Sequence, residues 1–263
     1  MFKKFITVAS SLALSAMCLT GCNQTTTDKE AKKTLDKVTI AEVTHSVFYA
    51  PQYAAVTKGF FEEEGIEVDI INTSGADKTM AALISGEAQV GLMGPEASIY
   101  VYNQGNENYA VNFAQLTKTD GSFIVAREEM PNFTLEDLKG KDILGGRKGG
   151  VPLMTLEYVL KKNGLTIGTN KEAGEVNVRT DVQFGVMAGA FAGGEGDFTT
   201  VFEPTGTQME EEGTGYIVAS VGELSREVAG DVPYTAYSTT KEFMADNEDL
   251  IQRFTNALYK GQQ

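Results

Sequence analysis

The sequence predicts an α/β protein built from two lobes. From residue 38 onward, short runs rich in β-branched residues alternate with stretches of helical length. Such alternation is typical of right-handed βαβ units on mostly parallel sheets. The alternation pauses after residue 126 and then starts a second time. Because the chain is long enough for either one large domain or two modest lobes, this restart is the observation that favours two lobes.

The predicted elements follow in order along the chain. Strands are expected over residues 38–44, 66–71, 89–93, 111–116, 122–126, 142–144, 176–179, 198–202 and 234–238. Helices are expected over residues 51–58, 76–85, 95–103, 153–162, 182–191 and 241–260. Thr240 can cap the last helix, in which Phe243, Leu250, Phe254 and Leu258 recur at roughly helical spacing. Residues 22–37 are almost entirely polar, which predicts a flexible tether.

The N-terminus has the pattern of an export signal. Lys3 and Lys4 precede an apolar run over residues 5–19, and a small residue and Cys22 follow it. The ending Leu-Thr-Gly-Cys resembles the bacterial lipobox, in which the cysteine is acylated and becomes the first mature residue. An ordinary signal peptide or a membrane-spanning helix are the alternatives, but a span needs about 20 apolar residues. We expect a signal peptide over residues 1–21 and a palmitate-type lipid on Cys22. The mature protein would then be extracytoplasmic, anchored to the bacterial cell membrane.

The composition excludes several classes of function. The formal net charge is −14, and it becomes −16 when residues 1–21 are removed, so a nucleic-acid partner is not expected. The only cysteines are Cys18 and Cys22, which leaves the predicted folded body without a thiol. This excludes disulfides, thiolate catalysis and cysteine metal sites there. His45 is the only histidine, so we expect neither a metal site nor a cofactor.

The loop after the first strand is the first candidate for a binding site. Residues 44–53 place Ser46, Phe48 and Tyr49 at the carboxyl end of a parallel strand, the edge where ligands collect in open α/β sheets. Taken singly, Phe48 and Tyr53 are each better explained as core residues, and His45 as an ordinary loop residue. The clustering of these side chains is what favours a site.

Two later loops each follow a strand and open a helix. The first contains Ser74 and Gly75, and the second contains Glu96. Amide groups at such helix starts can hold a carboxylate, sulfonate or phosphate. Helix capping alone also explains Ser74.

A glycine-rich turn over residues 145–152 contains Arg147, Lys148 and Gly149. No Gly-Lys-Ser/Thr follows, so a nucleotide phosphate loop is disfavoured. A backbone can still approach a small ligand there, with two cations available for an anion. Glu203 follows the strand over residues 198–202, where its carboxylate can accept from an amino-heterocycle or serve as an ordinary helix-start acid.

Three segments together resemble a known family: residues 49–55 (YAPQYAA), 58–68 (KGFFEEEGIEV) and 82–91 (ALISGEAQVG), with further matches over 197–204 and 232–235. They resemble the sulfonate, nitrate and thiamine-precursor branch of ABC-importer solute-binding proteins. The resemblance implies a type II periplasmic-binding-protein fold, with lobe 1 over residues 38–118 and 235–263 and lobe 2 over 119–234. Members of this family carry further C-terminal helices, so the resemblance also implies that these are truncated here.

The resemblance implies a monomeric capture protein that closes two lobes over a small solute and delivers it to an ABC permease. The expected ligand contacts are Ser46, Phe48, Tyr49, Ser74, Gly75, Glu96 and Thr117 from lobe 1, Arg147, Lys148, Gly149 and Glu203 from lobe 2, and Tyr234 at the hinge edge. The expected solute is a flat heteroaromatic such as a pyrimidine vitamin precursor. An alkanesulfonate or nitrate-type anion is the alternative.

Two functions from other classes stay open at this point, an exported enzyme and a surface adhesin. Related fungal pyrimidine synthases use a histidine and a cysteine-rich motif. Tyr49 stands where that histidine would be, and no cysteine motif is present. An enzyme is therefore not expected.

Overall fold

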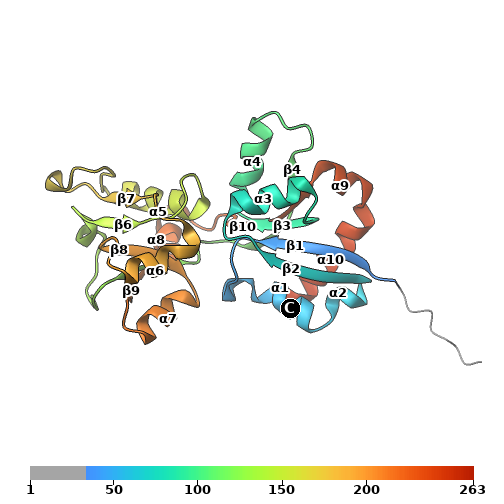
Figure 1. Cartoon of the computed structure of the whole chain (residues 1–263), viewed down its shortest axis with the longest axis horizontal. Coiled ribbons are helices and arrows are strands. Elements are labelled where there is room, and N and C mark those ends of the chain that lie inside the picture. Colours follow the sequence, from blue (N-terminus) through green and yellow to red (C-terminus); the bar gives the residue numbers. More distant parts are fainter. Residues whose placement is uncertain (1–33) are drawn as a thin grey trace, which may run out of the picture. The chain divides into compact units, whose positions relative to one another are not determined.

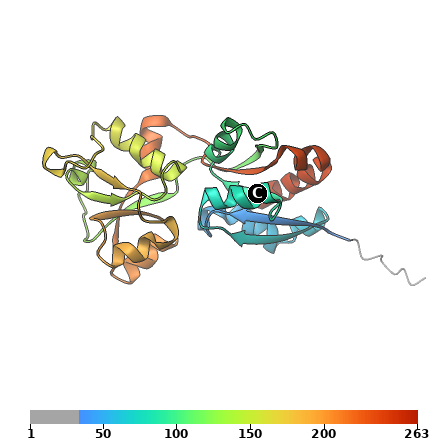
Figure 2. The same ribbon diagram turned by 45° about the horizontal axis from the view of Figure 1, so that its top comes forward.

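Residues 34–263 are described by the computed structural model of the chain. Their strands form two five-stranded sheets, and the chain crosses twice between them (Figures 1 and 2). The predicted signal peptide, Cys22 and most of the predicted tether lie outside the described residues. Within those residues, no helix is both long and apolar enough to cross a membrane.

The first sheet has the order β2-β1-β3-β10-β4. Its strands are β1 (Asp36–Glu42), β2 (Ile66–Asn72), β3 (Val90–Met93), β4 (Ala110–Thr117) and β10 (Thr235–Thr240). Its helices are α1 (Ala50–Thr57), α2 (Phe60–Glu63), α3 (Ala76–Ser85), α4 (Glu96–Asn103), α9 (Lys241–Asp246) and α10 (Glu248–Gln262). We call this sheet with its helices the first lobe.

The second sheet has the order β7-β6-β8-β5-β9. Its strands are β5 (Ser122–Ala126), β6 (Asp142–Leu144), β7 (Asn177–Arg179), β8 (Phe198–Phe202) and β9 (Tyr216–Ser220). Its α-helices are α5 (Val151–Lys162), α6 (Met187–Ala192), α7 (Thr205–Glu211) and α8 (Val221–Ala229). We call this sheet with its helices the second lobe. The α/β class is confirmed, but both sheets are mixed, because one strand of each pairs antiparallel with both of its neighbours. The residue limits of the lobes stay a prediction.

Each sheet contains one strand that runs against its neighbours. β10 is antiparallel to both β3 and β4, and β5 is antiparallel to both β8 and β9. Both are the first strand that the chain forms after crossing into that sheet. The other pairings in the sheets are parallel, so the carboxyl ends of the parallel strands of each sheet lie along one edge.

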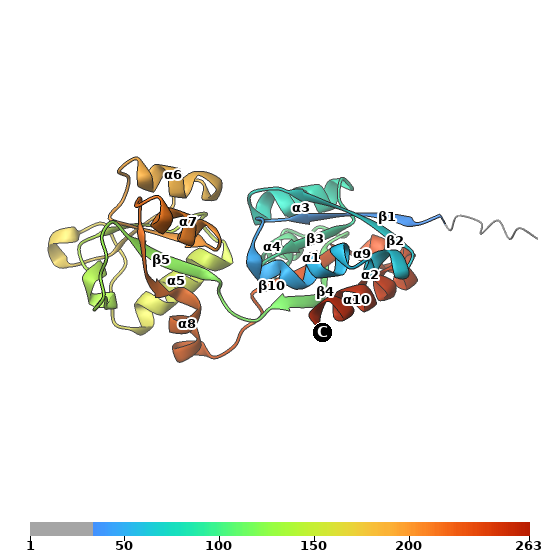
Figure 3. The ribbon, with the colours of Figure 1, turned by 90° about the horizontal axis from the view of Figure 1, so that it is seen from below.

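Helices cover both faces of the first sheet, α3 on one face and α1 and α10 on the other (Figure 3). Phe61, Tyr237 and Phe254 are almost fully buried in the core on the α10 face. Met80 and Leu83 of α3 pack with Met93 and α4 in a separate cluster. Burial of this apolar area is the main stabilising contribution to the lobe, at roughly 25 cal/mol per Å².

The structure corrects several predicted elements. The helix predicted over residues 241–260 is two helices, because Asn247 has φ −135° and ψ 37° and interrupts the hydrogen-bond ladder. Thr240 caps the first of them through Phe243, as predicted. The helix predicted over 182–191 begins with a 3-10 turn, Phe184–Val186, and continues as α6.

Several elements were absent from the prediction. Residues 60–63 form a separate helix, α2, because Gly59 adopts φ 76° and ends α1. β9 pairs only with β5 at the sheet edge and is half-buried along its length. Its apolar run is therefore short and did not predict a strand. α7 and α8 flank it. β1 begins at Asp36 and not at residue 38, since Asp36 pairs with Ile66.

Candidate ligand-binding site

A cavity between the two lobes lies at the carboxyl ends of parallel strands from both sheets. Thr44 follows β1, Gly94 follows β3, Gly145 follows β6 and Phe202 ends β8, and all four line the cavity. The cavity has a volume of about 70 Å³ and opens into about 660 Å³ of surrounding space that includes solvent. This edge is where open α/β sheets bind ligands.

The first residue of α4, Glu96, places a buried carboxylate in this cavity. Its Oε1 accepts a 3.3 Å hydrogen bond from the amide of Val151 in the second lobe. Its Oε2 is buried and has no hydrogen-bond partner among the described residues. Burial raises the pKa of Glu96, and the backbone amides of Glu96, Val151 and Ala97 together with Arg147 act in the opposite direction. This buried, unpaired Oε2 can accept a hydrogen bond from a donor group of a ligand.

The close approach of Glu96 depends on the glycine before it. A Cβ at Gly94 would collide with Glu96 Oε2 and lie 2.7 Å from Val151 Cγ2. Only glycine at this position lets the carboxylate, the α5 N-terminus and the strand end come together.

Arg147 from the second lobe is the cation that lines the cavity. Its guanidinium lies 3.4 Å from Asp77 and 3.6 Å from Glu96, both in the first lobe. The guanidinium is therefore already engaged with two carboxylates of the protein. The N-terminal amide of α5 is likewise occupied by Glu96.

Aromatic rings form much of the remaining wall. Tyr49, Phe184, Phe202 and Tyr234 line the cavity. Burial raises the pKa of Tyr49 far above its ordinary value, with the nearby carboxylate of Glu42 acting in the same direction. Burial likewise raises the pKa of Tyr234. Both tyrosines therefore stay protonated and uncharged, and the flat ring of a ligand can pack against them.

A second cavity, of about 70 Å³, adjoins the first and shares Tyr49, Phe202, Tyr234 and Thr235 with it. Its other lining residues lie on the loop after β1 and on the chain crossing from β4 to β5: Ser46, Phe48, Thr117, Thr119, Asp120 and Gly121.

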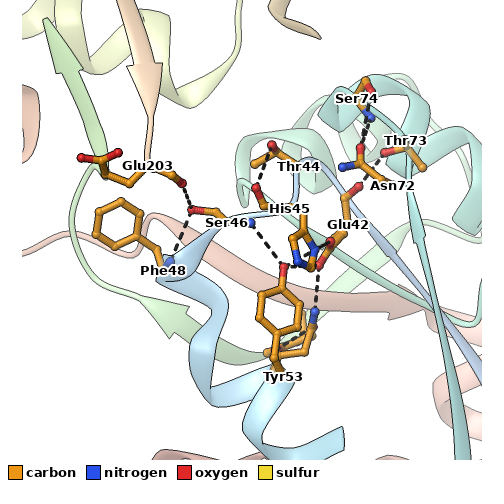
Figure 4. Close-up of polar contacts among 12 residues, drawn as sticks. Glu42, Thr44, His45, Ser46, Phe48, Tyr53, Asn72, Thr73, Ser74 and Glu203 are labelled. Atoms are coloured by element: carbon orange, nitrogen blue, oxygen red, sulfur yellow. Dashed lines mark hydrogen bonds and ion pairs between the residues drawn. The ribbon is translucent and has the colours of Figure 1, made fainter. Parts of the chain in front are cut away.

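A buried carboxylate that sequence reasoning missed holds the loop after β1 in place. Glu42 is 1% exposed and accepts hydrogen bonds from Gln52 at 2.9 Å and from the Tyr53 hydroxyl at 3.0 and 3.2 Å. His45 Nδ1 lies 2.9 Å from Glu42, and its ring stacks on Tyr53. Figure 4 shows the side chains of His45 and Tyr53 meeting at Glu42. The sequence pattern does not predict that these polar side chains meet, because they come from a strand, a loop and a helix.

The same loop carries a contact between the lobes. Ser46 is buried, and its hydroxyl donates a 3.0 Å hydrogen bond to the carbonyl of Glu203 (Figure 4). The Tyr100 hydroxyl donates similarly to the carbonyl of Gly149 at 2.9 Å. With Arg147, these contacts join the two sides of the cavity.

The structure brings eight of the twelve predicted contacts to the two cavities. Tyr49, Gly75, Glu96, Arg147 and Tyr234 line the first, and Ser46, Phe48, Thr117 and again Tyr49 and Tyr234 line the second. A role in ligand binding stays a prediction for all of them.

Four predicted contacts line neither cavity: Ser74, Lys148, Gly149 and Glu203. Ser74 has φ 58° and does not cap α3, whose N-cap is Gly75. Glu203 instead accepts hydrogen bonds from the amide and hydroxyl of Thr207 at the start of α7.

The described residues contain no cluster of three or more His, Cys, Asp or Glu side chains that could hold a metal ion. His45 is mostly exposed and lines neither cavity. The site therefore offers hydrogen bonds, one engaged cation and aromatic walls, an arrangement suited to binding.

Comparisons with known proteins agree with this architecture. The chain is 48% identical over 232 residues to the "Putative binding protein YtlA" of Bacillus subtilis, which covers 88% of this chain and 67% of that protein. The fold is similar to those of many solved structures, including the following three. One is the periplasmic aliphatic sulphonate binding protein SsuA of Escherichia coli (TM-score 0.64, 16% identity, 86% of this chain and 72% of that one).

The second is the periplasmic nitrate-binding protein NrtA of Synechocystis PCC 6803 (TM-score 0.69, 16% identity, 87% and 62% of the two chains). The third is the Candida albicans CA3427 gene product, described as having the generic periplasmic binding protein fold (TM-score 0.61, 14% identity, 86% and 71%). These likenesses confirm the expected fold. The family model described as NMT1/THI5 like matches residues 47–263, and the chain belongs to that family.

Proposed function

We propose that the protein is the extracytoplasmic solute-binding component of an ABC importer. The observation that carries the proposal is the cavity between two α/β lobes, placed at the strand ends of both sheets and holding a buried, half-satisfied Glu96. The name of the Bacillus subtilis relative and the titles of the sulphonate- and nitrate-binding structures support the same role.

In this mechanism the ligand favours the closed arrangement because it touches both lobes at once. Tyr49 and Glu96 come from the first lobe, and Arg147, Phe184 and Phe202 from the second. A ligand stabilises whichever arrangement gives it more contacts. No bond is broken, and the permease receives the solute unchanged.

For the solute we propose a flat amino-substituted heteroaromatic, such as a pyrimidine vitamin precursor. Aromatic side chains supply surfaces for stacking. The free Oε2 of Glu96 supplies an acceptor for a ring amine. A hydrogen bond to a charged group contributes about 1.5–3 kcal/mol.

An alkanesulfonate or nitrate-type anion is the second candidate, supported by the similarity to SsuA and NrtA. Two contacts weigh against it. Arg147 already lies beside Asp77 and Glu96, and the Val151 amide already donates to Glu96. An anion would have to displace these carboxylates and face Glu96 at close range.

A thermal-shift panel tests the solute class. We expect stabilisation by aminopyrimidines and none by alkanesulfonates or nitrate. The Glu96→Gln variant should weaken aminopyrimidine binding roughly 10- to 100-fold, because it removes a charged acceptor. Glu87→Gln, at an exposed position, is the matched control. Stabilisation by sulfonates alone would reject the aminopyrimidine proposal.

An exported enzyme is the alternative from another class, and the position of His45 outside both cavities disfavours it. After incubation with a bound aminopyrimidine, mass spectrometry should recover the compound unchanged from the protein and from a His45→Ala variant. Turnover that His45→Ala abolishes would reject the binding-protein proposal.

We further propose that lipid on Cys22 tethers the mature protein at the outer face of the membrane. Labelling cells with a palmitate analogue should mark the protein and its Cys18→Ser variant but not Cys22→Ser, which should also leave the membrane fraction. Equal labelling of the two variants would contradict the lipid anchor.

A further inference from the structure

Asp77 places a carboxylate at the margin of the first cavity without lining it. It is the second residue of α3, and its Oδ1 lies 3.4 Å from Arg147 Nε in the second lobe. A Cβ at Gly75, which lines the cavity, would lie 2.8 Å from the same oxygen. The carboxylate is therefore held beside the cavity wall, although the side chain of Asp77 is 57% exposed.

Arg147 is the only cation among the described residues that line either cavity. Its Nη2 lies 3.6 Å from Glu96 Oε1, so two carboxylates of the first lobe lie beside one guanidinium. With both carboxylates ionised, the three groups carry a net charge of −1. Lys78 and Lys148 adjoin Asp77 and Arg147 in the chain, but both are exposed, where water and salt screen their charges.

The two contacts of Arg147 leave it able to bind a neutral acceptor. Both are longer than the roughly 2.7–2.9 Å of a charge-assisted hydrogen bond. A guanidinium also has several N–H donors. A ring nitrogen can therefore accept from Arg147 while the carboxylates stay in place. An anion that approaches Arg147 also approaches Asp77 and Glu96, and both repel it.

Helix stabilisation is the ordinary explanation of Asp77, because an acidic residue in the first turn complements the helix dipole. Glu248 has this same place in α10 of the first lobe, where it is exposed and lines neither cavity. What distinguishes Asp77 is its contact with the cation of the cavity. A comparison of these two residues therefore separates helix stabilisation from an effect on the ligand.

We propose that Asp77 is a specificity-determining residue, which together with Glu96 outweighs the charge of Arg147 and makes the cavity reject anionic solutes. This inference rests on the proposed function, because it requires that the solute bind in the first cavity. Removal of both acidic charges leaves Arg147 as an unopposed cation. The cavity then becomes a site for a small anion.

Titration calorimetry with methanesulfonate at pH 8 and low ionic strength tests the proposal as a gain of binding. The unchanged protein should show no binding, and Glu96→Gln should show weak binding or none. Adding Asp77→Asn to Glu96→Gln should strengthen binding roughly 5- to 10-fold, counted from the detection limit if Glu96→Gln shows none. Adding Glu248→Gln instead should leave the affinity of Glu96→Gln unchanged. Loss of folding cannot produce such a gain, and circular dichroism of each variant accompanies the titration.

A parallel titration of the unchanged protein with 4-aminopyrimidine separates this inference from the function on which it rests. If 4-aminopyrimidine binds but Asp77→Asn adds nothing to Glu96→Gln, the role of Asp77 is overturned and the proposed function stands. An equal gain from Glu248→Gln also overturns that role, since the effect is then one of overall charge. If the unchanged protein binds methanesulfonate as tightly as the double variant, both the role of Asp77 and the aminopyrimidine proposal are overturned.

Discussion

At the scale of single residues, the two buried carboxylates of the site are held in an unfavourable environment. Glu96 and Asp120 are 7% and 3% exposed. Glu96 Oε2 has no hydrogen-bond partner among the described residues, whereas Asp120 accepts hydrogen bonds from Ser122 and Tyr234. Burial penalises the charged form of a carboxyl group and raises its pKa. Burying these carboxylates lowers the stability of the ligand-free protein. A hydrogen-bond donor on the ligand can offset this loss when the ligand binds.

Asp120 makes the stability of the protein depend on pH in a defined direction. Burial raises its pKa from 3.8 to about 6, and hydrogen bonding from Ser122 opposes that shift. Between these values the unfolded chain loses the proton first, so folded-state stability falls as pH rises from about 4 to about 6. Tyr234 is the other titratable group beside Asp120, and it stays protonated throughout this range.

Urea unfolding of the protein and of Asp120→Asn at pH 4 and pH 7 measures this effect. Between pH 4 and pH 7, the free energy of unfolding of the unchanged protein should fall by about 3 kcal/mol more than that of Asp120→Asn, because a shift of two pKa units corresponds to about this energy. If the stabilities of the two proteins changed equally with pH, the raised pKa of the buried Asp120 carboxyl would be contradicted.

At the scale of elements, α10 shows how one helix completes a core begun much earlier in the chain. Phe254 is fully buried and contacts the rings of Phe61 and Tyr237, with centroids 5.0 and 5.8 Å away. Arg253, next to it, donates to the carbonyl of Glu64 and pairs with Asp36 at 2.7 Å. The helix therefore fastens β1 and α2 on the face of the sheet opposite α3.

Replacing Phe254 with alanine should destabilise the protein by about 3–5 kcal/mol, because it leaves a cavity among buried rings. Tyr259→Ala on the same helix is the control, since Tyr259 is 63% exposed and should change stability by about 0.5 kcal/mol or less. Thermal or urea unfolding compares the two, and equal losses would mean that α10 does not complete this core.

At the scale of the whole molecule, few contacts join the lobes beyond the two crossings. Ser46 donates to the carbonyl of Glu203, and Tyr100 to that of Gly149. Glu96 accepts from the Val151 amide and lies beside Arg147, which also pairs with Asp77. A neutral hydrogen bond contributes about 0.5–1.5 kcal/mol. Such a small set of contacts allows a ligand to decide between open and closed arrangements.

Removing one of these contacts should weaken ligand binding by opening the cavity. Ser46→Ala should raise the dissociation constant roughly 2- to 10-fold, the equivalent of one neutral hydrogen bond. It should also increase the radius of gyration of the ligand-free protein in small-angle scattering. Ser85→Ala, which removes only a local bond to Ala82, should do neither. An unchanged affinity in Ser46→Ala would show that this contact plays no part in closure.

The sequence predicted much of the fold because its elements are encoded locally. The alternation of apolar runs and helical stretches placed most strands, and Thr240 caps the helix that it was expected to cap. The break at Asn247 and the edge strand β9 were missed, because the apolar spacing continues across the break and β9 is short and half-buried. Patterns of residue type carry little information about such interruptions.

The candidate site was predictable at its strand ends and helix starts, where Tyr49, Gly75, Glu96 and Arg147 lie. Glu42 and Asp120 were missed, because a single acidic residue in a sequence is expected at the surface. Their burial depends on segments that are distant in the chain. By itself, then, the sequence determined the class of fold and the family. The tertiary structure alone decided which carboxylates are buried and unpaired, since desolvation depends on what packs around a group and not on its neighbours in the chain.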